Sequence, residues 1–151
     1  MNNVFGAHEW AHESLNIITG CNHNCKYCYS KAMAIRFKRV TPNEWEHEKL
    51  RIHAISRPVK ELHGTYMFPS THDIHPEHLD ACIFYLGNII PNCDKVLVVS
   101  KPHFECIKKI CDVFKKDKHK ILFRFTIGSI NDDTLKFWEP GAPAFEERLR
   151  S

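Results

Sequence analysis

Four apolar runs, each followed by a stretch with helical spacing, dominate the hydrophobic pattern of this chain. The runs are SLNIITG (14–20), TYMFPST (65–71), KVLVVSK (95–101) and ILFRFTIGS (121–129). Their branched and aromatic residues are typical of β-strands. Because 95–101 is apolar almost throughout, we expect a strand that is covered on both faces.

The segments between and after these runs predict helices. They cover 26–37, 76–89 and 103–116, and a last helix begins in AFEERLR (144–150). Strands that alternate with helices in this way predict parallel strands joined by crossover connections. The predicted fold class is therefore α/β, a partial (βα) TIM-like barrel with parallel strands and about four βα units.

The pattern also divides the chain. We expect one domain at 14–151, preceded by an N-terminal extension at 1–13. The segment 38–64 is long and charged for a connection, so we interpret it as a solvated insertion. A helix is expected within it, around NEWEHEKL (43–50).

Composition adds a few exclusions. The 151 residues carry a net charge of +3, which is too small to indicate nucleic acid by itself. No stretch approaches the roughly 20 apolar residues of a membrane span, and the N-terminus lacks the basic and apolar parts of a secretory signal. Four cysteines are scattered through apolar helical patterns, and we expect them to be small core residues of a reducing, cytoplasmic protein: Cys82, Cys93, Cys106 and Cys111.

The remaining cysteines form the motif CNHNCKYC, directly after the first apolar run. Thiolates bind zinc or the irons of an iron–sulfur cluster, and the short gaps bring Cys21, Cys25 and Cys28 together on a helical turn or in a tighter loop. Three thiolates leave one iron of a four-iron cluster without a protein ligand. The alternative is zinc with His23 or His72 as fourth ligand, although no second cysteine pair is present.

Polar residues also lie near the carboxyl ends of the other predicted strands, where parallel α/β barrels gather their active groups. Ser70, Lys101 and Ser129 follow this rule. Lys101 suits either an anionic ligand or a solvated loop. Arg124, inside an apolar strand, predicts a buried acid partner or a ligand contact, whereas the histidines at 72 and 75 are interpreted as surface loop residues.

The motif CxxxCxxC, with Tyr27 before its last cysteine, resembles the signature of the radical S-adenosylmethionine (radical SAM) superfamily. The stretches SLNIITGCNHNCKYCYS, STHDI, VVSKP and RFTIGSINDDTLKFWEPGAPAFEERL are similar to its spore photoproduct lyase-like branch. The resemblance implies a [4Fe–4S] cluster on Cys21, Cys25 and Cys28 whose open iron binds S-adenosylmethionine (SAM). An electron from a donor such as flavodoxin or ferredoxin would then cleave SAM to methionine and a 5′-deoxyadenosyl radical, which abstracts hydrogen from a substrate.

The same resemblance implies roles for further residues in cofactor binding. Lys101, Thr126 and Arg148 would contact the carboxylate end of SAM, and Tyr27 would lie in the same site. Ser70, Thr71 and Asp73 would surround the amino end of SAM and the substrate. Ser70 stands where the branch has a hydrogen-donor cysteine, and a hydroxyl holds its hydrogen more tightly than a thiol. We therefore do not expect repair of DNA lesions by that route.

Other readings of the sequence stay open. One is a non-catalytic zinc or iron–sulfur domain. Another is a half-barrel completed by a second copy or a second chain, because the family's barrel has more units and an open sheet edge favours association. Nucleic-acid binding through the lysine-rich FKKDKHK (114–120) is a weaker option, since that run equally suits a solvated helix end.

Overall fold

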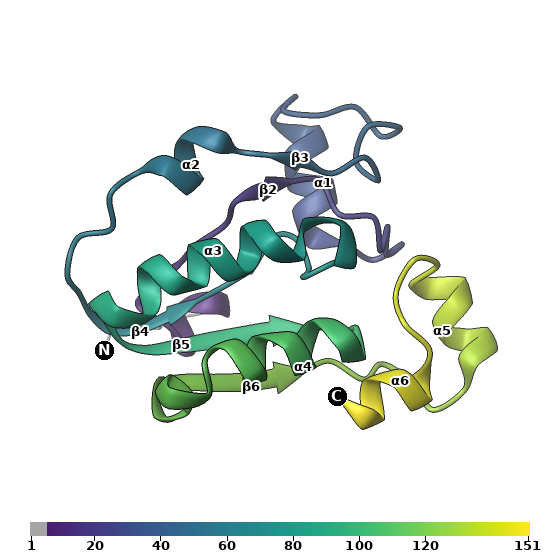
Figure 1. Cartoon of the computed structure of the whole chain (residues 1–151). Helices are drawn as coiled ribbons and strands as arrows, with labels where there is room; N and C mark the ends of the chain where they lie inside the picture. Colours follow the sequence, from purple (N-terminus) through teal and green to yellow (C-terminus); the bar gives the residue numbers. More distant parts are fainter. Residues whose placement is uncertain (1–5) are drawn as a thin grey trace.

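The computed structural model describes residues 6–151, and a four-stranded sheet lies at its centre (Figure 1). The strand order is β1 (Glu13–Ser14), β4 (Leu62–Met67), β5 (Cys93–Ser100) and β6 (Ile121–Phe125). Every neighbouring pair is parallel. The prediction of a parallel α/β sheet is confirmed and is consistent with a partial TIM-like fold, whereas a barrel stays a prediction.

Helices α3 (Leu79–Ile89) and α4 (Phe104–Val113) both lie on one face of this sheet (Figure 1). Their apolar side chains form the main core with the strand residues that point to that face: Tyr66, Val96 and Val98. The alternate residues Met67 and Leu97 point to the opposite face. Val96, Leu97 and Val98 are all buried, so the prediction that this strand is covered on both faces is confirmed.

The predicted strand 14–20 is wrong as a single strand. Its first part is β1, which pairs with β4, and its later part is β2 (Ile18–Thr19), which pairs antiparallel with β3 (Lys49–Leu50). Between them, the N–H of Ile17 donates to the His72 side chain, and the Asn16 side chain accepts a hydrogen bond from the N–H of Ser70, both in the loop that follows β4. The chain therefore leaves the sheet two residues after it has entered it.

The helix predicted around 43–50 is also wrong. This stretch forms turns and β3, and a short helix, α2 (Ile52–Ser56), follows instead. The carbonyl of Trp45 accepts a hydrogen bond from the N–H of Cys21, and the side chain of Trp45 is buried beside Cys21. The segment is thus partly a structural support, and its backbone groups are used by a distant loop rather than by a helix.

The C-terminal third of the described chain holds one helix that the sequence did not predict. Helix α5 (Asp132–Trp138) is capped by Asn131, whose side chain accepts a hydrogen bond from the N–H of Thr134 at 2.9 Å. Helix α6 (Phe145–Arg150) confirms the predicted last helix. Strand β6 ends at Phe125, so the predicted strand 121–129 is four residues too long.

The remaining helices are short. Helix α1 spans Tyr29–Arg36, so the predicted helix 26–37 begins three residues too early. The 3-10 helices are η1 (Gly6–Glu9), η2 (Pro76–His78), η3 (Ile90–Asn92) and η4 (Lys115–Lys120). Within residues 6–151, the helices lack the length and apolar character that crossing a membrane requires. The first five residues of the predicted extension 1–13 lie outside the described part.

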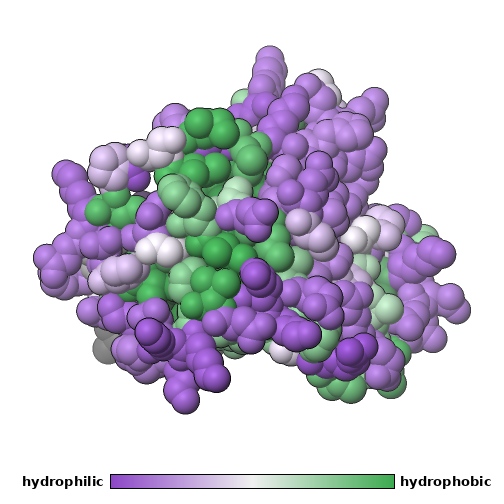
Figure 2. All heavy atoms as spheres, viewed as in Figure 1, coloured by the Kyte–Doolittle hydropathy of each residue, from purple (hydrophilic) through white to green (hydrophobic). Residues whose placement is uncertain are grey.

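Two side-chain predictions need correction. Cys82, Cys93 and Cys106 are buried as expected, but Cys111 is exposed because α4 turns it away from the core. Among the ion pairs of residues 6–151, Arg124 has no acid partner, so the predicted buried acid is wrong, whereas a ligand contact stays a prediction. Strand β6 is an edge strand with alternate residues exposed, and the Arg124 guanidinium lies 3.8 Å from the centre of the Trp10 ring. In the view of Figure 2, apolar side chains gather over α2 and around α3 within a mostly hydrophilic surface.

Candidate functional site

The cysteine loop, residues 21–28, connects β2 to α1. It is built from turns, with the N–H of Asn24 bonded to the carbonyl of Cys21 and the N–H of Cys28 bonded to that of Cys25. Cys28 is the N-cap of α1, and its sulfur accepts a hydrogen bond from the N–H of Lys31 at 3.3 Å. Of the two arrangements considered, the loop rather than the helical turn therefore carries the cysteines.

The three thiols are neighbours in a largely buried environment. Cys21 and Cys28 pack with Trp45 in one small apolar cluster, and Cys21 and Cys25 are buried. Burial raises the pKa of Cys21 to about 12. Burial also raises the pKa of Cys25, and the positive charge of Lys101 opposes that rise. Without a bound metal, Cys21 is therefore a neutral thiol.

The donor set suits an iron–sulfur cluster. Over the described range 6–151, no three or more His, Cys, Asp or Glu side chains are grouped so that they could hold a single metal ion. A cluster takes each thiolate on a different iron, so its sulfur ligands need not meet at one point. Metal binding also supplies the positive charge that displaces protons from buried thiols.

The segment 45–48 holds one side of the cysteine loop in place. Besides the bond from Cys21 to Trp45, the N–H of Asn22 donates to the Glu48 carboxylate at 3.1 Å. Gly20, just before the loop, has a φ of +93°, and a Cβ there would lie 2.6 Å from the Trp45 carbonyl oxygen. The entry to the loop therefore requires glycine and close contact with the insertion.

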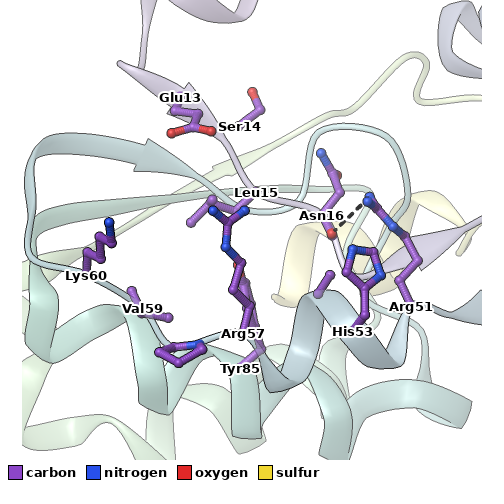
Figure 3. Close-up of a pocket in the computed structure, with 12 residues that line it drawn as sticks. Glu13, Ser14, Leu15, Asn16, Arg51, His53, Arg57, Val59, Lys60 and Tyr85 are labelled. Atoms are coloured by element: carbon purple, nitrogen blue, oxygen red, sulfur yellow. Dashed lines mark hydrogen bonds between the residues drawn. The ribbon is translucent and has the colours of Figure 1, made fainter.

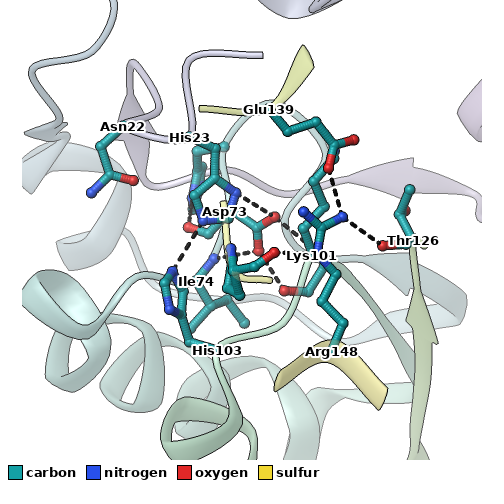
Figure 4. Close-up of polar contacts among 12 residues, drawn as sticks. Asn22, His23, Asp73, Ile74, Lys101, His103, Thr126, Glu139 and Arg148 are labelled. Carbon is teal, nitrogen blue, oxygen red and sulfur yellow. Dashed lines mark hydrogen bonds and ion pairs between the residues drawn. The ribbon is translucent and has the colours of Figure 1, made fainter. Parts of the chain in front are cut away.

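Asp73 lies beneath the cysteine loop, in the connection between β4 and α3, and it is buried (Figure 4). Its carboxylate accepts hydrogen bonds from the Ser100 hydroxyl and from the N–H of Lys101 at 2.8 Å, and it lies 3.3 Å from Nδ1 of His23. Burial raises the pKa of Asp73, but these partners outweigh it and keep the pKa below its usual value. The ionised carboxylate thus links the cysteine loop, its own loop and the end of β5.

A row of histidines continues from Asp73. Nε2 of the buried His23 lies 3.1 Å from Nε2 of His103, and Nδ1 of His103 lies 3.7 Å from the Glu147 carboxylate. The His75 ring is 5.1 Å from that of His103. Burial, assisted by His23 and His75, lowers the pKa of His103 to about 4. These side chains fill the space between the cysteine loop, α4 and α6.

Lys101 follows β5, as the sequence predicted, and lies beside the cysteine loop. Its ammonium is 5.7 Å from the centre of the Tyr27 ring, and its charge acts on Cys25. Tyr27 in turn lines a cavity of about 410 Å³ with residues from the loop after β6 and from α5 and its C-cap: Gly128, Ser129, Thr134, Leu135, Trp138 and Glu139. The cavity therefore lies directly against the cysteine loop.

Arg148 lies in α6 and points toward the same region (Figure 4). It is 1% exposed, and its Nη1 is 2.6 Å from the Glu139 carboxylate and 3.3 Å from the carbonyl of Thr126. Nη2 is buried without a hydrogen-bond partner among residues 6–151. Glu139 also accepts a hydrogen bond from the Tyr27 hydroxyl. Arg148 thus has one unused donor, while its remaining contacts fasten the C-terminal helices.

Ser70 and Thr71 lie in the loop that follows β4. The Asn16 side chain accepts hydrogen bonds from the N–H groups of both residues at 2.9 Å and donates to the Ser70 hydroxyl. His72 is buried rather than at the surface, which corrects the prediction, and its Nε2 accepts a hydrogen bond from the N–H of Ile17 at 3.3 Å. His75 is half-buried, so it is not a free surface histidine either.

The structure brings Lys101 and Asp73 next to the cysteine loop. Within the loop, Tyr27 donates to Glu139, which pairs with Arg148. Sequence reasoning missed the supporting residues: Asn16, Glu48, Ser100, His103 and Glu139. The sequence could have pointed to Glu139 only through the rule that a buried arginine needs a carboxylate partner. That rule was of no use, because the sequence does not indicate that Arg148 is buried. Backbone acceptors such as the Trp45 carbonyl cannot be identified from a sequence, because every residue has the same carbonyl group.

Residues 15–151 match the family described as the Radical SAM superfamily, so the chain belongs to this superfamily. Membership supports SAM-dependent radical chemistry in general and indicates an enzyme. The family typically uses a [4Fe–4S] cluster and SAM, and its members usually need a reductant partner. Searches of curated proteins and of solved structures find no match.

Proposed function

We propose that this chain binds a [4Fe–4S] cluster through Cys21, Cys25 and Cys28, and that SAM binds beside it. When bound, the cluster supplies the electron that cleaves SAM to a 5′-deoxyadenosyl radical, which abstracts hydrogen from a substrate. The single observation that carries this proposal is the position of Lys101. In a radical SAM chain, it places a cation next to a three-cysteine loop at the carboxyl end of a parallel strand.

Each side of the loop offers a contact for one part of SAM. Lys101 and the unused Nη2 donor of Arg148 suit a carboxylate, and Thr126 lies at the end of β6 beside them. The cavity against Tyr27 suits the adenosine, since its lining is partly aromatic. Glu139 and Trp138 would then exclude water from one side.

Ser70 and Thr71 would face the substrate or the amino end of SAM, because Asn16 fixes their backbone at the same edge. Asp73 has a different role in this proposal. Its carboxylate oxygens are engaged by Ser100, Lys101 and His23, so it positions the loop and Lys101 relative to each other.

The finer assignment is to the spore photoproduct lyase-like branch, on the sequence stretches quoted above. With Ser70 in place of a donor cysteine, the proposed reaction is hydrogen abstraction other than DNA-lesion repair by that route. A flavodoxin or ferredoxin is the proposed electron donor, and the proposed location is the cytoplasm.

The test is anaerobic reconstitution of the full chain with iron and sulfide. We expect about four irons per chain, and reduction with dithionite in the presence of SAM should release 5′-deoxyadenosine, measured by mass spectrometry. Zinc in place of iron would overturn the proposal in favour of a structural metal domain. Iron without 5′-deoxyadenosine would overturn the catalytic part and leave a cluster-binding protein.

Two substitutions separate the cluster from SAM binding. Cys25→Ala should abolish the brown chromophore, because two thiolates are too few to hold the cluster. Lys101→Ala should retain the iron but weaken SAM binding by about tenfold, the loss of one charge-assisted contact, measured by equilibrium binding. Lys108→Ala, an exposed lysine of α4, is the matched control. Unchanged SAM affinity in Lys101→Ala would remove this residue from the site.

A further inference from the structure

A second cavity lies beside the edge strand β1, and the cysteine loop does not contribute to it. Its volume is about 360 Å³, which is at the small end of the range for ligand pockets, about 300–1,000 Å³. Its walls come from the chain around β1, from α2 and the segment after it, and from α3. The residues that carry the argument are Glu13, Asn16, Arg51, Arg57, Lys60 and Tyr85 (Figure 3).

The charge on this lining is strongly one-sided. Arg51, Arg57 and Lys60 are cationic and Glu13 is the only carboxylate among the lining residues, so the net charge is +2 with His53 neutral. Within residues 6–151, none of these three cations forms an ion pair with a carboxylate. Like charges held around one cavity repel each other, and an anion bound among them would relieve that repulsion.

Helix α2 is what brings the cations together. Arg51 immediately precedes this helix and Arg57 immediately follows it, so a helix of five residues presents one guanidinium at each end. Arg57 reaches into the middle of the cavity, between Lys60 on one side and Arg51 on the other (Figure 3). Tyr85 lines the cavity together with both arginines and Glu13. Burial and the Glu13 carboxylate raise the pKa of Tyr85, and both arginines oppose this rise.

The arginines have unused hydrogen-bonding capacity. Arg51 makes one long bond, from Nη1 to the carbonyl of Asn16 at 3.4 Å, and no hydrogen bond of the Arg57 side chain is found within residues 6–151. Guanidinium groups match the geometry of phosphate oxygens with two parallel donors each. Leu15, Val59 and Tyr85 add apolar surface next to the cations, so the pocket suits an anion that is attached to an organic group.

We propose that this basic pocket, defined by Arg51, Arg57 and Lys60, binds the phosphate of a small phosphate monoester. The site requires neither the cluster nor SAM. It is nevertheless connected to the proposed site, because Asn16 lines the pocket and also fixes Ser70 and Thr71. Asn16 is therefore the residue that the pocket and the proposed site have in common.

The test is calorimetric titration of the full chain, with and without the reconstituted cluster, with ribose 5-phosphate. Ribose is the uncharged control, and inorganic phosphate is the competitor. We expect saturable binding of the ester, competition by phosphate and no binding of ribose. Because the titration does not depend on the cluster, a failure of SAM cleavage leaves this result interpretable, and the reverse also holds.

The double variant Arg51→Gln/Arg57→Gln should weaken binding of ribose 5-phosphate by at least about tenfold. Both side chains are exposed, so circular dichroism should show an unchanged fold, and Lys60→Gln serves as a milder variant. Arg36→Gln/Arg39→Gln removes the same charge from another exposed surface and should bind normally. Equal weakening in both double variants would overturn the pocket in favour of general charge attraction. Binding confined to a short single-stranded oligonucleotide would overturn the monoester in favour of a nucleic-acid surface.

Discussion

At the residue scale, the Asp73 carboxylate joins three loops that come from distant parts of the sequence. It contacts His23 of the cysteine loop, Ser100 and Lys101 at the end of β5, and the N–H of Ile74 in its own loop. A buried carboxylate is tolerated only when its oxygens are paired in this way. Its partners are therefore also what fixes the distance between the thiols and Lys101.

The variant Asp73→Asn tests this role. It removes the charge that accepts hydrogen bonds from Ser100 and Lys101 while keeping the size of the side chain, and a hydrogen bond to a charged group is worth roughly 1.5–3 kcal/mol. We expect the free energy of unfolding in urea to fall by about that amount. Asp112→Asn, on the exposed side of α4, should change it little. An unfolding curve for Asp73→Asn that superimposes on the wild type would contradict the linking role.

His72 predicts a dependence of stability on pH. Burial lowers its pKa to about 4, and the neutral ring accepts the N–H of Ile17 while its Nδ1 contacts the carbonyl of Asp73. In the unfolded chain the pKa returns to about 6.5, so the unfolded state binds more protons between these values. The contribution of His72 is present above pH 6.5 and is lost as the pH falls toward 4.

We expect this loss to reach about 3 kcal/mol near pH 4, measured as the free energy of unfolding across the pH range. The lowered pKa of His103 makes stability depend on pH in the same direction. Comparison of the wild type with His72→Gln therefore separates the contribution of His72 from that of His103. The variant should be less stable at neutral pH and should lose less on acidification. Parallel pH profiles for the two proteins would show that His72 does not carry the effect.

At the scale of elements, the C-terminal helices act as a support for the cysteine loop. The N–H of Lys26 donates to the carbonyl of Trp138 at 2.8 Å, and the N–H of Gly141 donates to that of His23 at 3.1 Å. A Cβ at Gly141 would overlap the carbonyl of Asn22. The pair between Glu139 and Arg148 holds α5 and α6 in the position that these contacts need.

Substitution Glu139→Gln should loosen this support. Arg148 would keep its buried charge and lose its carboxylate partner, which costs roughly 3–5 kcal/mol. We expect faster hydrogen exchange at the amides of Lys26 and Gly141, read by mass spectrometry, together with a lower melting temperature. Glu146→Gln, exposed on α6, is the control. Unchanged exchange at both amides would contradict the support.

Some of the helices and strands could be predicted from the sequence, and others could not. The parallel strands β5 and β6, helices α3 and α4, and Lys101 beside the cysteines were predictable, because hydrophobic periodicity and strand-end chemistry are local signals. The broken first strand was not, because its hydrogen bonds depend on partners far along the chain. The start of α2 was not either, because the N–H of Arg51 before it bonds to the carbonyl of the distant Ile17. Helix α5 is set by its Asn131 cap rather than by an apolar stripe. Arg148 was predicted toward SAM, whereas most of its donors bind within the protein.

At the scale of the whole molecule, the sheet has two different edges. Strand β1 has the basic pocket beside it, whereas β6 exposes Leu122, which is 57% accessible. Association of a second copy or a second chain with this open sheet stays a prediction, and sedimentation analysis of the purified chain checks it. The cysteine loop lies at one end of the sheet, between the segment 45–48 and α5 (Figure 1).

The contact between Trp45 and Cys21 has a consequence for anyone who wants a smaller version of this protein. By length and charge, residues 38–50 are the obvious part to delete and replace with a tight turn. Such a deletion would remove the carbonyl that receives the Cys21 amide, the carboxylate that receives the Asn22 amide and the strand that pairs with β2. A smaller version of this radical SAM scaffold must therefore retain residues 38–50, although they have little regular structure. Residues could be removed elsewhere, for example in η4 between α4 and β6.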